Sequence, residues 1–320
     1  MKIDRNLRYA LVLSGGGAKG LAHLGFLRAL LERGWPEPSL VVGTSMGAII
    51  GGLYASGTGL GELHRYVLEE FDITKHLDGF TFKLAEPVAR VFQAGKLLGN
   101  LAAKPGIDSG EHIEALIDRF LGVKTFEETR IPFRCNAVDL VSGQEVVFRS
   151  GPLGRAIHAS MSIPMIFAPV TETGPNGRAM CLVDGGLADN LPVHIAEAEG
   201  FSRILAVDVG GFRDQDPGDF VSVPKIAYRC LEYVMFSRAR RQDAWEGATV
   251  INAAGGTAGG AAGGKAATLL SFDRKRELVA LGEQSVAANQ GTLETFFGKG
   301  YEAAAARRRA RKRRRQTRAR

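Results

Sequence analysis

One strand-turn-helix stretch constrains the fold of this chain more than any other. Residues 40–42 form an apolar run that is typical of the end of a buried strand. The glycines and serine of a G-x-S-x-G pattern follow at once (Gly43, Ser45, Gly47), and residues 48–50 begin a helical pattern. This order favours a sharp turn with Ser45 exposed at a helix N-terminus, where backbone N–H groups and the dipole stabilise an anion. The pattern alone also occurs in ordinary Gly/Ser turns, so it needs support from elsewhere in the chain.

A second glycine-rich turn lies near the N-terminus. Residues 9–13 form a short apolar run that predicts a first buried strand. It runs into the segment 14–20, Ser-Gly-Gly-Gly-Ala-Lys-Gly, and leucines at helical spacing then predict a helix that Gly34 ends. A strand, a glycine-rich turn and a helix form an anion-binding arrangement, because no side chains separate the backbone N–H groups.

Three interpretations of this turn compete. Gly15, Gly17 and Gly20 fit a dinucleotide fingerprint, but that site needs an acidic residue after the second strand, where Ser45 and its neighbours stand. A phosphate-binding P-loop needs Ser or Thr after Lys19, where Gly20 stands. The third interpretation, an oxyanion hole beside a serine nucleophile, meets neither objection.

The rest of the chain alternates strands with helices. The predicted helices cover residues 46–54, 60–70, 110–121, 152–160, 192–199, 223–244 and 271–288, and the predicted strands cover 131–140 and 144–149 (a hairpin), 180–183, 204–209 and 249–251. Segment 71–105 is either a pair of helices over the core or an apolar lid that lines a substrate pocket. We therefore expect an α/β fold with an open, mainly parallel central sheet and helices on both faces.

A third motif follows the predicted strand 180–183. Asp184 ends this strand and precedes Gly185 and Gly186, so its carboxylate can point into a crevice. In open parallel sheets the reactive groups gather at the carboxyl ends of the strands. The glycine-rich turn, Ser45 and Asp184 would then form one site.

Together these motifs resemble those of the patatin-like phospholipases, also called lipid acyl hydrolases. The resemblance covers roughly Tyr9 to Val209 and departs from the family where Lys19 replaces a frequent Arg. From about Phe212 no motif matches. The resemblance rests on four segments in the family's order: 15–20 (GGGAKG), 43–47 (GTSMG), 159–164 (ASMSIP) and 184–186 (DGG).

The resemblance implies the roles of the site residues. Ser45 and Asp184 would form a catalytic dyad without histidine, which cleaves fatty acyl esters of phospholipids or lysophospholipids through an acyl-enzyme. The implied oxyanion hole comprises Gly15, Gly16, Gly17 and Met46, and the supporting glycines are Gly20, Gly43, Gly47, Gly185 and Gly186. From the residues alone, a Ser–Asp–His triad remains open and could use only His194. A non-catalytic lipid-binding or regulatory protein is the alternative function.

Charge and cysteine content indicate the kind of partner and the cellular compartment. The net charge of +7 comes from the segment Arg307–Arg320, whose ten basic residues leave a body with 31 basic and 34 acidic residues. We expect this tail to touch an anionic membrane at its periphery, although a polybasic segment can also bind nucleic acid nonspecifically or stay solvated. Three scattered cysteines and the short N-terminal apolar run favour a reduced, cytoplasmic compartment.

The sequence also predicts how the chain is divided. We expect a catalytic domain over residues 1–250, an Ala/Gly-rich flexible loop over 251–270, a C-terminal helical segment over 271–300 and a disordered polybasic tail over 301–320. No cluster with metal-ligand spacing is apparent, so we expect no metal or cofactor. A lipid ester is the expected partner, and the oligomeric state is left open.

Overall fold

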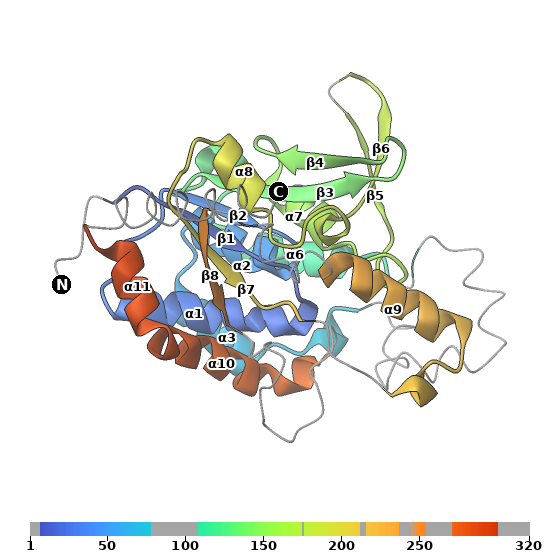
Figure 1. Ribbon diagram of the computed structural model, residues 1–320. Coiled ribbons are helices and arrows are strands. Elements are labelled where there is room, and N and C mark those ends of the chain that lie inside the picture. The colour runs from blue at the N-terminus through green and yellow to red at the C-terminus, as the bar shows by residue number, and fades with distance from the viewer. Residues whose placement is uncertain are drawn as a thin grey trace, which may run out of the picture.

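The centre of the molecule is a mixed sheet of eight strands. The computed structural model describes residues 7–77, 106, 108–174, 176–211, 216–236, 245, 247–253 and 271–299. The strand order is β5-β6-β3-β2-β1-β7-β8, and β4 pairs with β3 beside this path (Figure 1). The strands are β1 (Ala10–Leu13), β2 (Leu40–Gly43), β3 (Phe133–Asp139), β4 (Gln144–Phe148), β5 (Val170–Thr173), β6 (Ala179–Asp184), β7 (Ile204–Asp208) and β8 (Ala248–Asn252).

Helices connect and cover these strands. The α-helices are α1 (Leu21–Glu32), α2 (Met46–Ser56), α3 (Leu60–Glu69), α6 (Glu111–Phe120), α7 (Leu153–Met161), α8 (Val193–Ala198), α9 (Val223–Phe236), α10 (Lys275–Ala288) and α11 (Gln290–Phe297). The 3₁₀ helices are η1 (Gly17–Gly20), η2 (Ile73–Lys75), η4 (Phe126–Glu128), η5 (Gly185–Leu187), η6 (Pro217–Asp219) and η8 (Phe272–Arg274).

The central strands β1, β2 and β7 are buried on both faces of the sheet, since successive residues of a strand point to opposite sides and all of theirs are buried. Leu11 and Leu13 of β1 belong to the larger apolar core, which α1, α2, α7, α10 and α11 complete. Ala10 and Val12 face a smaller core together with apolar residues of α8. Strands buried on both faces appear as continuous apolar runs, which is why β1, β2 and β7 were recognisable in the sequence. The predicted α/β class with helices on both faces is confirmed.

Strand directions differ from the expectation at one side of the sheet. β1, β2, β3, β7 and β8 run parallel, whereas β4 and β6 run antiparallel to β3 and β5 runs antiparallel to β6. The assumption that Asp184 ends a parallel strand is therefore wrong. Asp184 nevertheless reaches the edge at which Ser45 lies, because β3 extends past the end of β2. Gly43 of β2 pairs with Cys135, and Asp184 pairs with Ala137, two residues further along β3.

Other differences are small or fall outside the described residues. The hairpin β3–β4 is present as predicted, and β5 was not predicted. The long helix expected over 223–244 is described as α9 up to Phe236. Most of the segment 71–105 and the Ala/Gly-rich loop lie outside the described residues, so those predictions stay open.

The C-terminal helices α10 and α11 pack into the larger core. α10 lies along α1 (Figure 1), and a β-carbon on Gly25 or Gly282 would collide with backbone atoms of the opposite helix. In α11, Phe296 and Phe297 make edge-to-face contacts with Tyr9, and Phe297 stacks on Trp35. The segment therefore contributes to the hydrophobic core despite lying outside the recognised motifs.

None of the described helices combines the length and the apolar character that a bilayer span requires. The three cysteines are unpaired; Cys135 is buried, Cys181 is half-buried and Cys230 is exposed.

Candidate active site

Ser45 lies at the sharp turn between β2 and α2. Its backbone adopts φ 54° and ψ −122°, a conformation that non-glycine residues rarely adopt. Such strain persists where the surroundings hold it, and it is frequent at functional sites. The side chain is almost fully buried, with 3% exposed, at the N-terminus of α2. The backbone geometry is that expected of a nucleophile elbow, but the prediction that Ser45 is exposed is wrong, because the turn is enclosed by its neighbours.

Close backbone packing explains the glycines around Ser45. A β-carbon on Gly43 would collide with the backbone of Gly47, and one on Gly47 would collide with the carbonyl of Leu13. Side chains at these positions would push the turn away from β1. The other supporting glycines leave room in the same way for neighbouring groups: Gly20 for Met46, Gly185 for Asn136, and Gly186 for Met235 and Asp184.

Asp184 is fully buried at the end of β6, beside Ser45. Its Oδ1 accepts a hydrogen bond from the Gly186 amide at 2.7 Å. The Ser45 side chain interacts with the carboxyl group and lowers its pKa. That contact does not reach regular hydrogen-bond geometry in the described chain, since Oδ2 has no hydrogen-bond partner. Contacts between catalytic groups often tighten only when substrate binds.

Burial dominates the electrostatics of Asp184. Desolvation raises the pKa of its carboxyl group to about 7, against the opposing effects of Ser45 and the Gly186 amide. A carboxyl group with a pKa near 7 is a stronger base than an exposed one and is still substantially ionised at neutral pH. The site therefore holds a carboxylate suited to accept a proton from a hydroxyl.

The glycine-rich turn lies directly against Ser45. A β-carbon on Gly15 would lie 3.0 Å from Cβ of Ser45. The Gly15 amide, however, donates to the Asn190 carbonyl at 3.0 Å, so this amide is already engaged and the expectation that it faces an oxyanion requires correction. The amides of Gly16, Gly17 and Met46 make no hydrogen bond within the described part of the chain. Gly17 has φ 55°, a left-handed conformation that favours glycine.

Two polar residues that sequence reasoning missed hold this turn in place. Asn190 donates from Nδ2 to the Gly15 carbonyl at 3.1 Å, and its buried Oδ1 has no hydrogen-bond partner among the described residues. Asp208 ends β7 and accepts from the Gly210 amide at 2.8 Å and from the Ser14 hydroxyl. Asp208 also ends an apolar strand, with Val209 and then two glycines after it, and its likeness to Asp184-Gly185-Gly186 was the available signal.

The turn that follows α7 contacts both Ser45 and Asp184. Ser160 Oγ accepts the Ser45 amide at 3.0 Å, and the Ser162 carbonyl accepts the Asp184 amide at 2.9 Å. Both bonds are buried. The segment 159–164 therefore links the two predicted catalytic residues through its serines.

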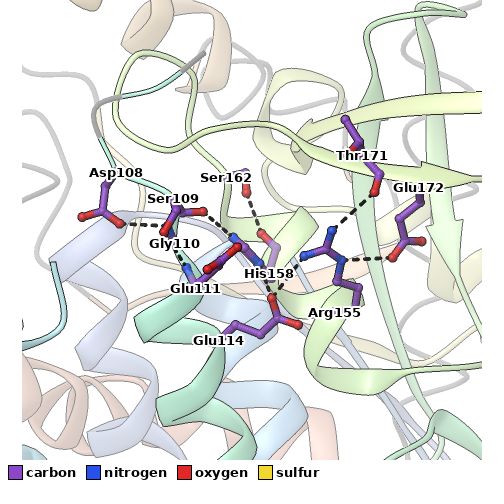
Figure 2. Close-up of polar contacts among 10 residues, drawn as sticks. All are labelled: Asp108, Ser109, Gly110, Glu111, Glu114, Arg155, His158, Ser162, Thr171 and Glu172. Carbon is purple, nitrogen blue, oxygen red and sulfur yellow. Dashed lines mark hydrogen bonds and ion pairs between the residues drawn. The ribbon is translucent and has the colours of Figure 1, made fainter. Parts of the chain in front are cut away.

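A polar network fixes α7 against its neighbours (Figure 2). Nδ1 of His158 lies 2.5 Å from a carboxylate oxygen of Glu114 in α6, and Ser162 Oγ donates to the His158 carbonyl at 2.8 Å. Arg155 pairs with the same glutamate and with Glu172 of β5. The hydrogen bond from His158 lowers the pKa of Glu114. This network holds the end of α7, and with it Ser160 and Ser162, in one position.

The two ring nitrogens of His194 face carboxylates other than that of Asp184. Its Nε2 lies 2.9 Å from Glu145 and its Nδ1 lies 3.3 Å from Asp189, so both ring nitrogens face carboxylates. These carboxylates raise the pKa of His194 to about 9, which keeps the ring protonated near neutral pH. A protonated imidazole cannot act as a general base, and this argues against the Ser–Asp–His triad that uses His194.

In the part of the chain that the structure describes, no group of three or more His, Cys, Asp or Glu side chains is arranged to hold a metal ion.

Sequence comparisons identify relatives of this chain. A family model described as patatin-like phospholipase matches residues 11–197. The lysophospholipase NTE1 of Eremothecium gossypii is 32% identical over 211 residues, which cover 66% of this chain and 12% of that protein. An uncharacterized NTE family protein of Mycobacterium tuberculosis is 33% identical over 215 residues, which cover 66% of this chain and 52% of that protein. The matched region is thus a small part of the first relative and about half of the second.

Solved structures show weaker similarity. VipD from Legionella pneumophila aligns with a TM-score of 0.43 and 19% identity, over 85% of this chain and 66% of that chain. The type III effector ExoU, known from Pseudomonas aeruginosa, aligns with a TM-score of 0.41 and 17% identity, over 90% of this chain and 53% of that chain.

Proposed function

This chain belongs to the family of patatin-like phospholipases, and we propose that it is a lipid acyl hydrolase in which Ser45 is the nucleophile and Asp184 the base. The supporting observation is the pairing of a strained, buried serine with a buried carboxyl group whose pKa burial raises to about 7. A surface serine next to an ordinary aspartate would have neither property. The unengaged amides of Gly16, Gly17 and Met46 next to this pair add the groups that ester hydrolysis needs.

In the proposed first half-reaction, Ser45 Oγ attacks the ester carbonyl carbon. Asp184 accepts the hydroxyl proton as the new C–O bond forms, and the carbonyl oxygen becomes an oxyanion. The amides of Gly16, Gly17 and Met46 would donate to this oxyanion, and one such donor is worth about 10²–10³ in rate. The ester C–O bond then breaks, and protonated Asp184 gives the proton to the departing alcohol. An acyl group remains on Ser45.

In the second half-reaction, water takes the place of the alcohol. Asp184 removes a proton from the water, whose oxygen attacks the acyl carbon, and the proton passes to Ser45 Oγ as the acyl bond breaks. The fatty acid leaves and the free serine is restored. Asp184 Oδ2 and Asn190 Oδ1, which are buried and have no hydrogen-bond partner in the described part of the chain, are the acceptors for this water.

For the substrate, we propose fatty acyl esters of phospholipids or lysophospholipids. Named relatives of this chain include lysophospholipases. We further propose a cytoplasmic enzyme that meets lipid at a membrane surface, with the basic segment Arg307–Arg320 as one peripheral contact. The family resemblance also implies calcium independence, and we include this in the proposal.

The experiment that tests the proposal compares variants on two substrates. Ser45→Ala and Asp184→Asn should each lower turnover of a short aryl ester and of lysophosphatidylcholine by about 10³-fold or more, because the residues act as one unit. Ser150→Ala, at an exposed serine, is the matched control and should retain full turnover. If the wild-type chain binds lysophosphatidylcholine but hydrolyses neither substrate, the non-catalytic alternative is correct. Unchanged turnover in Asp184→Asn would remove the dyad.

A further inference from the structure

One buried amide side chain, that of Asn136, lies between the two segments that carry the proposed dyad. In the sheet, β3 separates β2 from β6, and Asn136 stands between the two β3 residues that pair with the ends of those strands. Cys135 pairs with Gly43, and Ala137 pairs with Asp184. The side chain of Asn136 is fully buried. It is therefore placed to contact both segments at once.

The amide of Asn136 bonds to the residue before the nucleophile and to the residue after the base. Its Oδ1 accepts a hydrogen bond from the Thr44 hydroxyl at 2.7 Å. Its Nδ2 donates to the Gly185 carbonyl at 3.3 Å and to the Asp189 carbonyl at 3.2 Å. The Thr44 hydroxyl also lies 3.3 Å from the Asp189 carbonyl. One side chain thus joins the turn before α2 to the turn after β6.

The Gly185 carbonyl is the acceptor on which the turn after Asp184 closes. It accepts the amides of Ala188 and Asp189, each at 3.0 Å, in addition to Nδ2 of Asn136. The next amide, that of Gly186, donates to the Asp184 carboxyl group. The position of the Gly185 peptide therefore governs where this carboxyl group is held.

A closed ring of polar contacts fixes the position of the Asn136 amide. Nδ2 donates to Glu145 Oε1 of β4 at 2.8 Å, and the other oxygen of Glu145 lies 2.9 Å from Nε2 of His194. Nδ1 of His194 lies 3.3 Å from the Asp189 carboxylate, and the Asp189 carbonyl accepts from Asn136. This ring explains what His194 does in a site where it does not act as the base.

The chemistry of this position calls for an amide. Nδ2 of Asn136 faces oxygen acceptors, whereas Oδ1 faces a hydroxyl, so the surroundings also determine which way the amide points. An aspartate would turn an oxygen toward two carbonyls and a carboxylate. A leucine of similar size would leave the buried Thr44 hydroxyl without this acceptor.

We propose that Asn136 is a positioning residue for the reaction: its bonds to Thr44 and to the Gly185 carbonyl set the placement of Ser45 Oγ relative to the Asp184 carboxyl group. This role rests on the hydrolase function proposed above. Asn136 touches neither substrate nor the reacting atoms, and it acts through the two peptides beside them. A misplacement of about 1 Å between reacting groups can lower a rate by about 10²-fold.

The kinetics of Asn136→Leu test this role. The matched control is Asn289→Leu, which removes an amide that donates to the Ser285 carbonyl at 2.8 Å in α10, away from the dyad. For a short aryl ester, kcat should fall about 10²-fold in Asn136→Leu while KM changes by less than about threefold, because geometry and not substrate binding is lost. The control should keep both constants. An unchanged kcat, or a loss confined to KM, would overturn the proposal.

Thr44→Val approaches the same contact from its other side and preserves the shape of the side chain. Its kcat should fall about tenfold or more, and the double variant with Asn136→Leu should be no slower than Asn136→Leu alone, since both changes break one link. Losses that multiply would show two independent effects and contradict the link. If Asn136→Leu does not fold, kcat of Thr44→Val decides, and a normal value counts against the role.

Hydrogen exchange followed by mass spectrometry tests the link without turnover. The amides of Ser45, Asp184 and Asp189 are hydrogen-bonded, so their exchange reports opening of the two turns. Exchange in the segments 44–48 and 184–190 should quicken about tenfold or more in Asn136→Leu and stay unchanged in Asn289→Leu.

The positioning role and the hydrolase function fail in different ways. Equal exchange of both segments in Asn136→Leu and the wild type would show that Asn136 does not hold the turns, whatever the enzyme activity. If exchange quickens as expected but the wild type hydrolyses no ester, Asn136 holds the two turns together and the hydrolase function is wrong.

Discussion

At the scale of a single residue, the burial of Asp184 governs how readily its carboxyl group ionises. The carboxyl group is fully enclosed, and one of its oxygens lacks a hydrogen-bond partner in the described chain. Both features disfavour the ionised form, which the site needs as a base. Enzymes often retain such unfavourable arrangements because they serve the reaction rather than the fold.

The pH dependence of hydrolysis follows from this carboxyl group. Because the proposed base must be ionised, kcat/KM for a short aryl ester should rise about tenfold per pH unit at low pH and level off above a midpoint near 7. Stopped assays across pH 4–9 measure the profile. A midpoint near 4, the ordinary range of an aspartate, would contradict a buried base.

A substitution at Asn190, beside Asp184, tests whether the pH profile belongs to Asp184. Asn190 Oδ1 and Asp184 Oδ1 each lie 3.0 Å from the position of a β-carbon on Gly186, so the two side chains are neighbours. Asn190→Asp adds a second carboxylate beside Asp184, which raises the pKa of the base. The midpoint of the residual activity should therefore move to higher pH. A midpoint that does not move would assign the profile to another group.

Asp184→Asn should make the chain more stable at alkaline pH while it removes activity. The folded state raises the pKa of Asp184 from 3.8 to about 7, so the native protein binds this proton more tightly than the unfolded chain does. Stability from this group is thus present below pH 4 and is lost as pH rises to 7. Above pH 7 the free energy of unfolding of the wild type should be lower than that of Asp184→Asn by up to about 4 kcal/mol.

Urea denaturation of the wild type and Asp184→Asn at pH 4 and pH 8 measures this difference. The two chains should have nearly equal free energies of unfolding at the lower pH, and the variant should be more stable at the higher pH. Equal stability at both would mean that water reaches the carboxyl group.

At the scale of elements, α1 and α10 cross at glycines. A β-carbon on Gly282 would collide with the Ala22 carbonyl, whereas one on Gly291 in α11 would meet nothing within 4 Å. Gly282→Ala should therefore lower the free energy of unfolding by about 3 kcal/mol, because the backbones must separate. Gly291→Ala should raise it by up to about 1 kcal/mol through helix propensity.

The measurement is the urea midpoint of each variant, followed by circular dichroism. A single cooperative transition that shifts in opposite directions for the two variants indicates that α10 and α11 unfold together with the catalytic core. Two separate transitions, with the larger unaffected by Gly282→Ala, would support the expected division into a catalytic domain over 1–250 and a separate helical segment over 271–300.

The elements also show which parts of the structure were predictable from sequence. β1, β2 and β7 were recognisable because strands buried on both faces are continuous apolar runs. β5 was not, since its alternating Val170–Thr173 pattern is short and mostly polar. The predicted direction of β6 was wrong because the sequence of a short strand does not show whether it pairs parallel or antiparallel with its neighbour.

The candidate site likewise contains residues that were predictable from the sequence and residues that were not. Ser45, Asp184 and the glycines were recognisable because their chemistry or backbone conformation demands these residue types. The partners that hold them were not. Asn190 and Asp208 act through hydrogen bonds to Gly15 and Ser14, far along the chain, and a sequence does not show which distant group a common polar side chain will meet.

At the scale of the whole molecule, the proposed reaction requires several distant segments to meet. The first 50 residues supply the glycine-rich turn and Ser45, residues 159–190 supply the serines and Asp184, and α9 lies against their edge. The C-terminal helices close the core behind α1. The larger core thus includes residues of helices that follow the matched family region, residues 11–197.

Labelling of the full chain by a fluorophosphonate tests the central claim most directly, because the probe reacts with activated serines. Peptide mapping by mass spectrometry should find a single adduct on Ser45. Labelling should disappear in Ser45→Ala, persist in Ser150→Ala and slow strongly in Asp184→Asn. A wild-type chain that takes up no probe, or one whose labelling survives Ser45→Ala, would contradict the account.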